Sequence, residues 1–232
     1  MNGFGVLKGS KVFVGLDPSA GDKNPSGIAI INETGAVLQL GVWMMFQELP
    51  QILGPFQEKI LTIAIDGPLQ PPGELNYCCF SDAAAICHHR QTTPYKGRYA
   101  EYLLNRNGFR CFTTSRQSFA RRWISRCFEL NEYVKGLGYR TIEAYPTAAR
   151  KILFPGILVS KKLLHNRKKL QEDLKTVGII VPHSLKIYSD HELDAVLAAY
   201  TALLEHNGST LKIGNVEDGF IIIPQIKLKY RS

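Results

Sequence analysis

Three aspartates lie at the edges of the most apolar segments of this sequence. Asp17 ends the segment 11–17, Asp66 ends the segment 60–66, and Asp194 lies near the start of an apolar stretch that extends to Leu204. An unpaired carboxylate is costly to bury, so three of them around one core need compensation. Carboxylate oxygens are the ligands that Mg²⁺ and Mn²⁺ prefer. The pattern predicts that Asp17, Asp66 and Asp194 share a Mg²⁺ or Mn²⁺ site.

The two acids that end strands also have a structural interpretation. Asp17 precedes Pro18 and Ser19, and Asp66 precedes Gly67 and Pro68. Both sequences are typical of Asx turns, in which the carboxylate hydrogen-bonds to its own backbone. The recurrence of acids at several edges of one core favours the metal site.

The acids near Asp194 leave a second alternative open. Asp190, Glu192 and Asp194 all fall in the first turn of a predicted helix, where acids interact favourably with the helix dipole. If the helix is rotated relative to the predicted register, Glu192 or Asp190 replaces Asp194 as the ligand.

The elements that position these acids alternate between strands and helices. Ser189 and Glu192 form a capping box that begins an apolar helix reaching Leu204. A second helix is predicted over residues 116–135, with Phe119 and Trp123 on its apolar side. Strands are predicted at 11–17, 27–31, 36–40, 60–66 and 139–146, with a closing hairpin of 210–213 and 220–223.

Positive charge is concentrated in the middle of the chain. The 232 residues carry 28 basic and 20 acidic side chains, a net charge of +8. Residues 88–127 contain nine basic side chains and one acid, so this segment alone accounts for the excess. Arginine binds phosphate in bidentate fashion, so the excess fits a polyanionic partner, and a solvated helix face is an equally good interpretation. We expect phosphate contacts from Arg116, Arg121, Arg122 and Arg126.

The cysteines indicate a reducing compartment. There are five of them, an odd number, and no C-x-x-C pair is present. The cluster Cys87-His88-His89 is the most metal-like, but its spacing favours free thiols and surface imidazoles over a zinc site. No apolar run is long enough to cross a membrane and the N-terminus does not resemble a signal peptide, so we expect a cytoplasmic protein.

Six short motifs are spread in order along the chain: 15–19 (GLDPS), 24–30 (NPSGIAI), 64–69 (AIDGPL), 142–148 (IEAYPTA), 191–202 (HELDAVLAAYTA) and 218–224 (DGFIIIP). Together they resemble the motifs of the family called domain of unknown function 429, whose members are predicted nucleases. The resemblance implies a ribonuclease H-like α/β fold, with a mixed sheet, flanking helices and a helical insertion. We expect a single domain over residues 1–232, with the basic insertion at about 69–138.

The resemblance also implies a reaction and its residues. In ribonuclease H-like enzymes the first strand, a later strand end and a late helix supply the acids, which are the places of Asp17, Asp66 and Asp194. The predicted function is cleavage of DNA or RNA by two metal ions about 3.5–4 Å apart. Asp17 would bridge both ions, and His191 or Glu143 would orient the attacking water or add a ligand.

Two other classes of protein remain possible from the sequence. Actin-like phosphotransferases also begin with a Gly-x-Asp strand and a hairpin, although 232 residues are few for their two lobes. A non-catalytic nucleic-acid-binding module on the same fold is the other.

Overall fold

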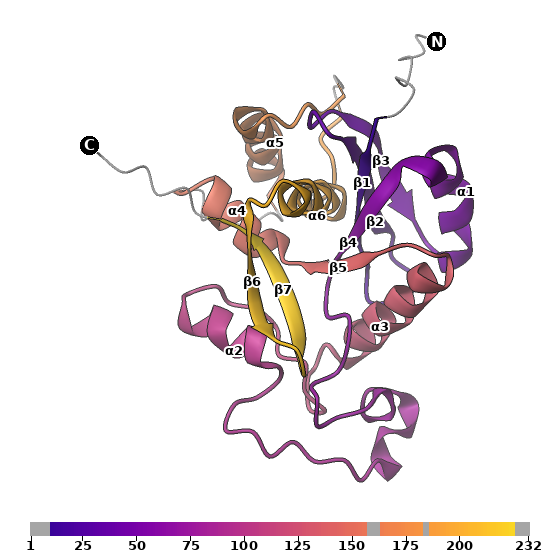
Figure 1. Cartoon of the computed structure of the whole chain (residues 1–232), viewed down its shortest axis with the longest axis vertical. Coiled ribbons are helices and arrows are strands. Elements are labelled where there is room, and N and C mark those ends of the chain that lie inside the picture. Colours follow the sequence, from indigo (N-terminus) through magenta and orange to yellow (C-terminus); the bar gives the residue numbers. More distant parts are fainter. Residues whose placement is uncertain (1–9, 157–162, 183–185, 226–232) are drawn as a thin grey trace.

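Seven strands form one mixed sheet in a computed structural model that describes residues 10–156, 163–182 and 186–225 (Figure 1). The strands are β1 (Val12–Asp17), β2 (Ser26–Asn32), β3 (Val37–Trp43), β4 (Ile60–Asp66), β5 (Thr141–Ala144), β6 (Thr210–Asn215) and β7 (Gly219–Pro224). Their order across the sheet is β3-β2-β1-β4-β5-β7-β6. The antiparallel β1-β2-β3 unit is followed by β4, which is parallel to β1, and by β5, which is parallel to β4. This is ribonuclease H-like topology, which confirms the predicted fold class.

The β2–β3 connection shows why the first unit is antiparallel. The Asn32 side-chain oxygen accepts hydrogen bonds from the backbone N–H groups of Thr34 and Ala36, at 3.0 and 2.9 Å. Gly35 has φ of +83°, a conformation that suits glycine. The turn is therefore too short for anything but a hairpin, as the sequence predicts.

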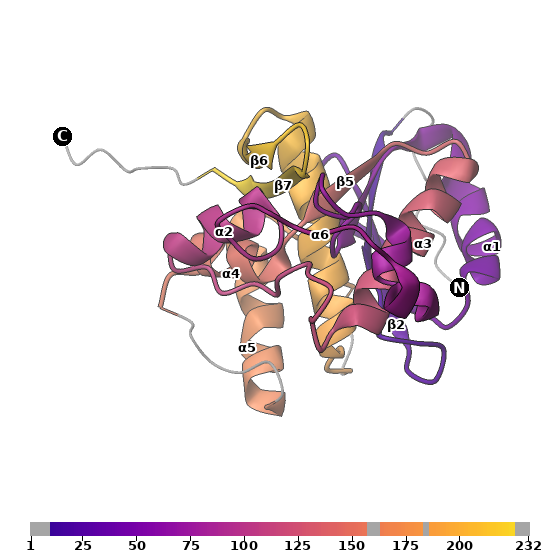
Figure 2. The ribbon, with the colours of Figure 1, turned by 90° about the horizontal axis from the view of Figure 1, so that it is seen from below.

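Helices cover both faces of the sheet (Figures 1 and 2). Helix α6 packs on one face against Phe13, Ala29 and Ala64, whereas α1 and α3 pack on the other against Val14 and Ile65. The helices are α1 (Leu49–Leu53), α2 (Tyr99–Arg106), α3 (Arg121–Gly136), α4 (Pro146–Leu153), α5 (Leu164–Asp173) and α6 (Asp190–His206). Short 3₁₀ helices are at Phe46–Glu48, Gly54–Lys59, Tyr77–Cys79, Asp82–Ile86 and Leu174–Val177.

Two glycines set the distance between α6 and the sheet. A Cβ atom on Gly15 would lie 1.9 Å from the carbonyl oxygen of Ala195, and a Cβ atom on Gly27 would lie 2.0 Å from that of His191. Helix α6 thus rests directly on the strand backbone. The predicted capping box begins the helix: Glu192 N–H donates to Ser189 Oγ at 3.1 Å, and Ser189 N–H donates to the Glu192 carboxylate at 2.8 Å.

The regular structure of the basic segment between β4 and β5 is all helical, with long loops between the helices and no strand in the part that the structure describes. Its α3 contributes Leu130 and Val134 to the core of the sheet, and its α2 packs Ala100 and Leu104 against β7. The prediction that Phe119 lies on the buried side of a helix was wrong. Helix α3 begins only at Arg121, and Phe119 is 88% exposed in the preceding turn. None of the described helices is both long and apolar enough to span a bilayer.

Candidate metal centre

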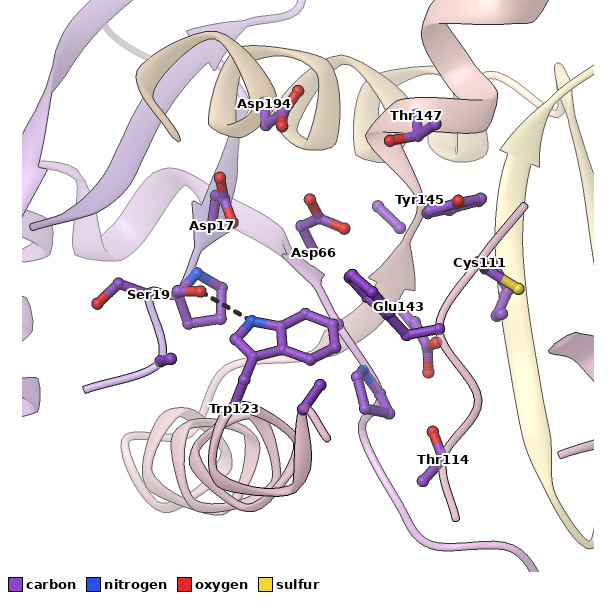
Figure 3. A pocket seen from close by; sticks show the side chains of 18 of the residues that line it. Asp17, Ser19, Asp66, Cys111, Thr114, Trp123, Glu143, Tyr145, Thr147 and Asp194 are labelled. Atoms are coloured by element: carbon purple, nitrogen blue, oxygen red, sulfur yellow. Dashed lines mark hydrogen bonds between the residues drawn. The ribbon is translucent and has the colours of Figure 1, made fainter. Parts of the chain in front are cut away.

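Three carboxyl groups converge at one edge of the sheet (Figure 3). Asp17 ends β1, Asp66 ends β4 and Asp194 lies in the first turns of α6. Because β1 and β4 are parallel neighbours, with Leu16 paired to Ile65, their terminal acids meet at the same edge. One carboxylate oxygen from each acid lies within 4.8 Å of the other two. The predicted convergence is confirmed.

The backbone of α6 brings a fourth polar group to these acids. Asp17 is the strand partner of Gly27, and the first turn of α6 lies directly on Gly27. This close approach places His191 Nδ1 at 2.7 Å from Asp17 Oδ2. The His191 ring is partly exposed, whereas the Asp17 side chain is buried. The structure therefore brings His191 to the acids through Asp17, a contact that the sequence does not specify.

The converging acids fit a small divalent cation. An octahedral Mg²⁺ binds oxygens at about 2.1 Å, so two ligands on one ion are at most about 4.2 Å apart. Two ions that share a ligand lie about 3.5–4 Å apart, so the ligand oxygens of such a pair can be farther from one another than those of a single ion. The three oxygens lie within 4.8 Å of one another, which is compatible with one shared ion or with two. All three donors are hard oxygen ligands, which Mg²⁺ and Mn²⁺ prefer.

The choice among the acids of α6 follows from their contacts. Glu192 uses its carboxylate for the cap, and Lys186 Nζ donates to its other oxygen at 2.8 Å. Asp190 lines the same cavity as the acids, yet the converging group among the described residues is Asp17, Asp66 and Asp194. The predicted helix register therefore holds, with Asp194 facing the strand acids.

Glu143 is engaged in a buried ion pair. Arg98 Nη1 and Nη2 donate to its two carboxylate oxygens at 2.6 and 2.5 Å, and Arg98 Nε donates to Glu101 at 2.8 Å. Burial raises the pKa of Glu143, and the Arg98 guanidinium opposes that rise. Burial alone would lower the pKa of Arg98, but the two glutamates raise it overall.

Glu143 consequently belongs to the wall of the site. Both its oxygens bind Arg98, and among the described residues the converging acids do not include it. In this structure Glu143 binds Arg98, and its expected part in orienting water or binding metal stays a prediction. Sequence reasoning missed Arg98, because its partner Glu143 is 45 residues away and no local pattern joins them.

The acids open into a cavity of about 890 Å³. Trp123 lies on its wall, where its indole N–H donates to the Pro18 carbonyl at 2.9 Å and ties α3 to the loop that follows Asp17 (Figure 3). Phe112 and Phe119 also line the cavity and are 55% and 88% exposed. Their rings meet edge to face at 5.3 Å. The acid cavity therefore has an exposed aromatic rim.

The four arginines expected to bind substrate are dispersed. Arg122 lines the acid cavity, and Arg121 lines an adjacent cavity of about 680 Å³. Arg126 lines that second cavity, but its guanidinium is bound to the Asp22 carboxylate and the Met44 carbonyl.

Arg116 lines a third cavity, and its guanidinium holds the carbonyls of Ala84, Cys87 and His89. The prediction that Arg116 lies beside the acids is therefore wrong, because its guanidinium donates to backbone carbonyls of the loop instead. Arg110 lines the acid cavity, so it is better placed than Arg116 to contact a phosphate near the acids. The sequence does not predict this role for it. Its only sequence signal is membership of the basic segment.

Comparisons with known proteins add little beyond the fold. No protein-family model and no curated protein matches the chain, so the resemblance to the domain of unknown function 429 family is not confirmed. Among solved structures, the chain is similar to RuvC from Thermus thermophilus, with 11% sequence identity and a TM-score of 0.45. The alignment covers 85% of this chain and 96% of RuvC. The order and directions of the strands show that the chain has a ribonuclease H-like fold.

Proposed function

We propose that this protein hydrolyses phosphodiester bonds of nucleic acid with the help of Mg²⁺ or Mn²⁺. The observation that carries the proposal is the convergence of Asp17, Asp66 and Asp194 within 4.8 Å at the open edge of a ribonuclease H-like sheet. Carboxylates gathered in this way repel one another unless a cation neutralises them. A divalent cation supplies that compensation.

The residues of the site would have separate roles. Asp17, Asp66 and Asp194 would hold the ions, and Asp17 has the central place because it also contacts His191. Bound ions of this kind lower the pKa of a water molecule and stabilise the leaving oxygen. His191 would orient Asp17 through the hydrogen bond that its Nδ1 makes with the Asp17 carboxylate. Arg98 and Glu143 keep the cavity wall rigid.

The rim of the cavity suits a nucleic-acid strand. Arg110 and Arg122 are exposed and line the cavity, so their guanidinium groups can neutralise phosphates on either side of the cleaved bond. Phe112 and Phe119 offer exposed ring faces beside them. Unpaired bases stack on such side chains, with about 1–3 kcal/mol per base. The combination favours a substrate with unpaired nucleotides near the scissile phosphate.

An endpoint assay on defined substrates tests the proposal. End-labelled single-stranded and double-stranded DNA and RNA are incubated with protein in Mg²⁺, Mn²⁺ or EDTA. We expect cleavage in either metal, none in EDTA, and loss of cleavage in Asp17→Asn, Asp66→Asn and Asp194→Asn. Asp190→Asn is the matched control, since it removes an acid of the same helix outside the converging group.

The same experiment separates the alternatives. Hydrolysis of ATP that depends on Asp17, without cleavage of any nucleic acid, would indicate the actin-like phosphotransferase. Salt-dependent binding without cleavage in either metal would indicate a binding module. Either result contradicts the proposed nuclease.

A further inference from the structure

A second group of metal-ligating side chains lies in the loop region that follows β4. Cys78, Cys79, Cys87 and His89 each present a ligand atom within 4.8 Å of the others. Three sulfurs and one imidazole nitrogen are the donor set of a closed structural zinc site. We propose that these four residues bind one Zn²⁺ ion, which fixes the loop to α3.

Two of the three distances to Cys87 Sγ fit a shared ion. Cys78 Sγ and His89 Nδ1 each lie 3.5 Å from Cys87 Sγ. Thiolates bound at about 2.3 Å to one tetrahedral zinc are about 3.8 Å apart, which is close to these values. Cys79 Sγ is nearer to Cys87 Sγ, at 2.6 Å, so these two sulfurs would have to separate by about 1.2 Å to bind one zinc ion together. A disulfide would use two of the four groups and leave Cys78 and His89 without a role.

His89 has the second contact that zinc-binding histidines need. Its Nε2 lies 2.7 Å from the side-chain amide of Asn76. A ligating histidine commonly donates its other N–H to an acceptor, which fixes the ring. The oxygen and nitrogen of an asparagine amide are interchangeable by a flip, so Asn76 can accept this proton. Nδ1 is then the nitrogen directed to the sulfurs.

The surrounding chain holds both halves of the cluster in place. Cys79 is buried and packs with Phe80, Ile124 and Phe128. Arg116 donates to the carbonyls of Cys87 and His89 at 3.1 and 2.8 Å, and these hydrogen bonds fix the backbone that carries the other two ligands. Residues 67–97 otherwise contain only two short 3₁₀ helices in the described structure. A loop with so little regular structure gains most from a metal cross-link.

Metal analysis of the full chain, purified under reducing conditions, tests the proposal. We expect one zinc per chain by mass spectrometry, and less than about a tenth of that in Cys87→Ser. His89→Ala should bind zinc markedly more weakly, whereas His88→Ala is the matched control, because the neighbouring His88 is exposed and outside the cluster. Asp17→Asn should retain the zinc, which separates this site from the acidic one.

A second measurement uses the wild-type protein, so it does not depend on whether the variants fold. Wild-type protein stripped of zinc and titrated with Co²⁺ should develop the visible absorption of a tetrahedral cobalt thiolate, which Zn²⁺ then abolishes. Reduced wild-type protein that holds no zinc and gives no cobalt spectrum overturns the proposal. So does an intact mass two hydrogens lower, with a peptide linking Cys79 to Cys87, because that result shows a disulfide instead.

Discussion

Substituting Gly27 with alanine should separate the acids without touching any of them. A Cβ atom at this position would lie 2.0 Å from the His191 carbonyl oxygen, whereas ordinary contact begins at 3.4 Å. The first turn of α6 must therefore move by up to 1.4 Å, the difference between these values. Overpacking of this kind costs about 1–3 kcal/mol of stability. The same movement carries His191 and Asp194 away from Asp17.

The expected loss of metal binding is large. We take the loss of Mn²⁺ affinity as about 100-fold, since disturbing the groups that orient metal ligands typically costs about 10–100-fold. At a Mn²⁺ concentration of about 100 times the wild-type Kd, the ion stabilises wild type by about 2.7 kcal/mol. An affinity 100-fold weaker leaves about 0.4 kcal/mol at the same concentration. For a chain of this size, the gain in Tm should fall from roughly 5–10 °C to about 1 °C.

Thermal melts with and without Mn²⁺ measure this directly. Gly41→Ala is the control, since it lies in β3 and a Cβ there meets no atom within 4 Å. We expect Gly41→Ala to behave as wild type. If folded Gly27→Ala gains as much Tm from Mn²⁺ as wild type does, α6 does not position the metal ligands and the reasoning is refuted.

Three further predictions concern the acids, the ion pair and the rim. Asp17→Asn should abolish metal-dependent cleavage and raise the Tm of the metal-free protein, because repulsion among the acids falls; equal melts and surviving activity would make Asp17 a turn residue. Arg98→Met should destabilise the fold by about 3–5 kcal/mol in urea unfolding, since it leaves the buried Glu143 charge uncompensated; a destabilisation below about 1 kcal/mol would contradict the buried pair. Arg110→Ala with Arg122→Ala should weaken duplex binding and lower the salt slope by roughly 0.9 for each phosphate that the variant no longer neutralises; an unchanged slope would place the nucleic acid elsewhere.

The strands and the three aspartates were predictable because their signals are local. An apolar run that ends on an acid marks a buried strand whose end faces the site, and Asp17 and Asp66 both follow this pattern. The Ser189 and Glu192 capping box set the register of α6, which in turn placed Asp194.

The other features of the site depend on interactions between distant residues. Arg98 looked like one more member of a basic segment, yet it is fully buried between Glu101 and Glu143. Phe119 looked like a helical core residue, but the helix begins two residues after it. Neither outcome can be read from spacing, because burial of these side chains is decided by tertiary packing.

The cysteine cluster shows the same limit. The order Cys78-Cys79, Cys87, His89 lacks the C-x-x-C spacing by which zinc sites are usually found. A 3₁₀ helix at Tyr77–Cys79 and a return of the chain through Asp82–Ile86 bring the thiols together. The spacing of these residues along the chain therefore does not show that their side chains meet.

A crystal of the wild-type protein soaked in Mn²⁺ tests the central claim most directly. We expect anomalous peaks bound by oxygens of Asp17, Asp66 and Asp194 at about 2.0–2.2 Å, and no such peaks in Asp17→Asn crystals soaked in the same way. Saturating Mn²⁺ that leaves no anomalous peak on these three carboxylates in wild type would contradict the account.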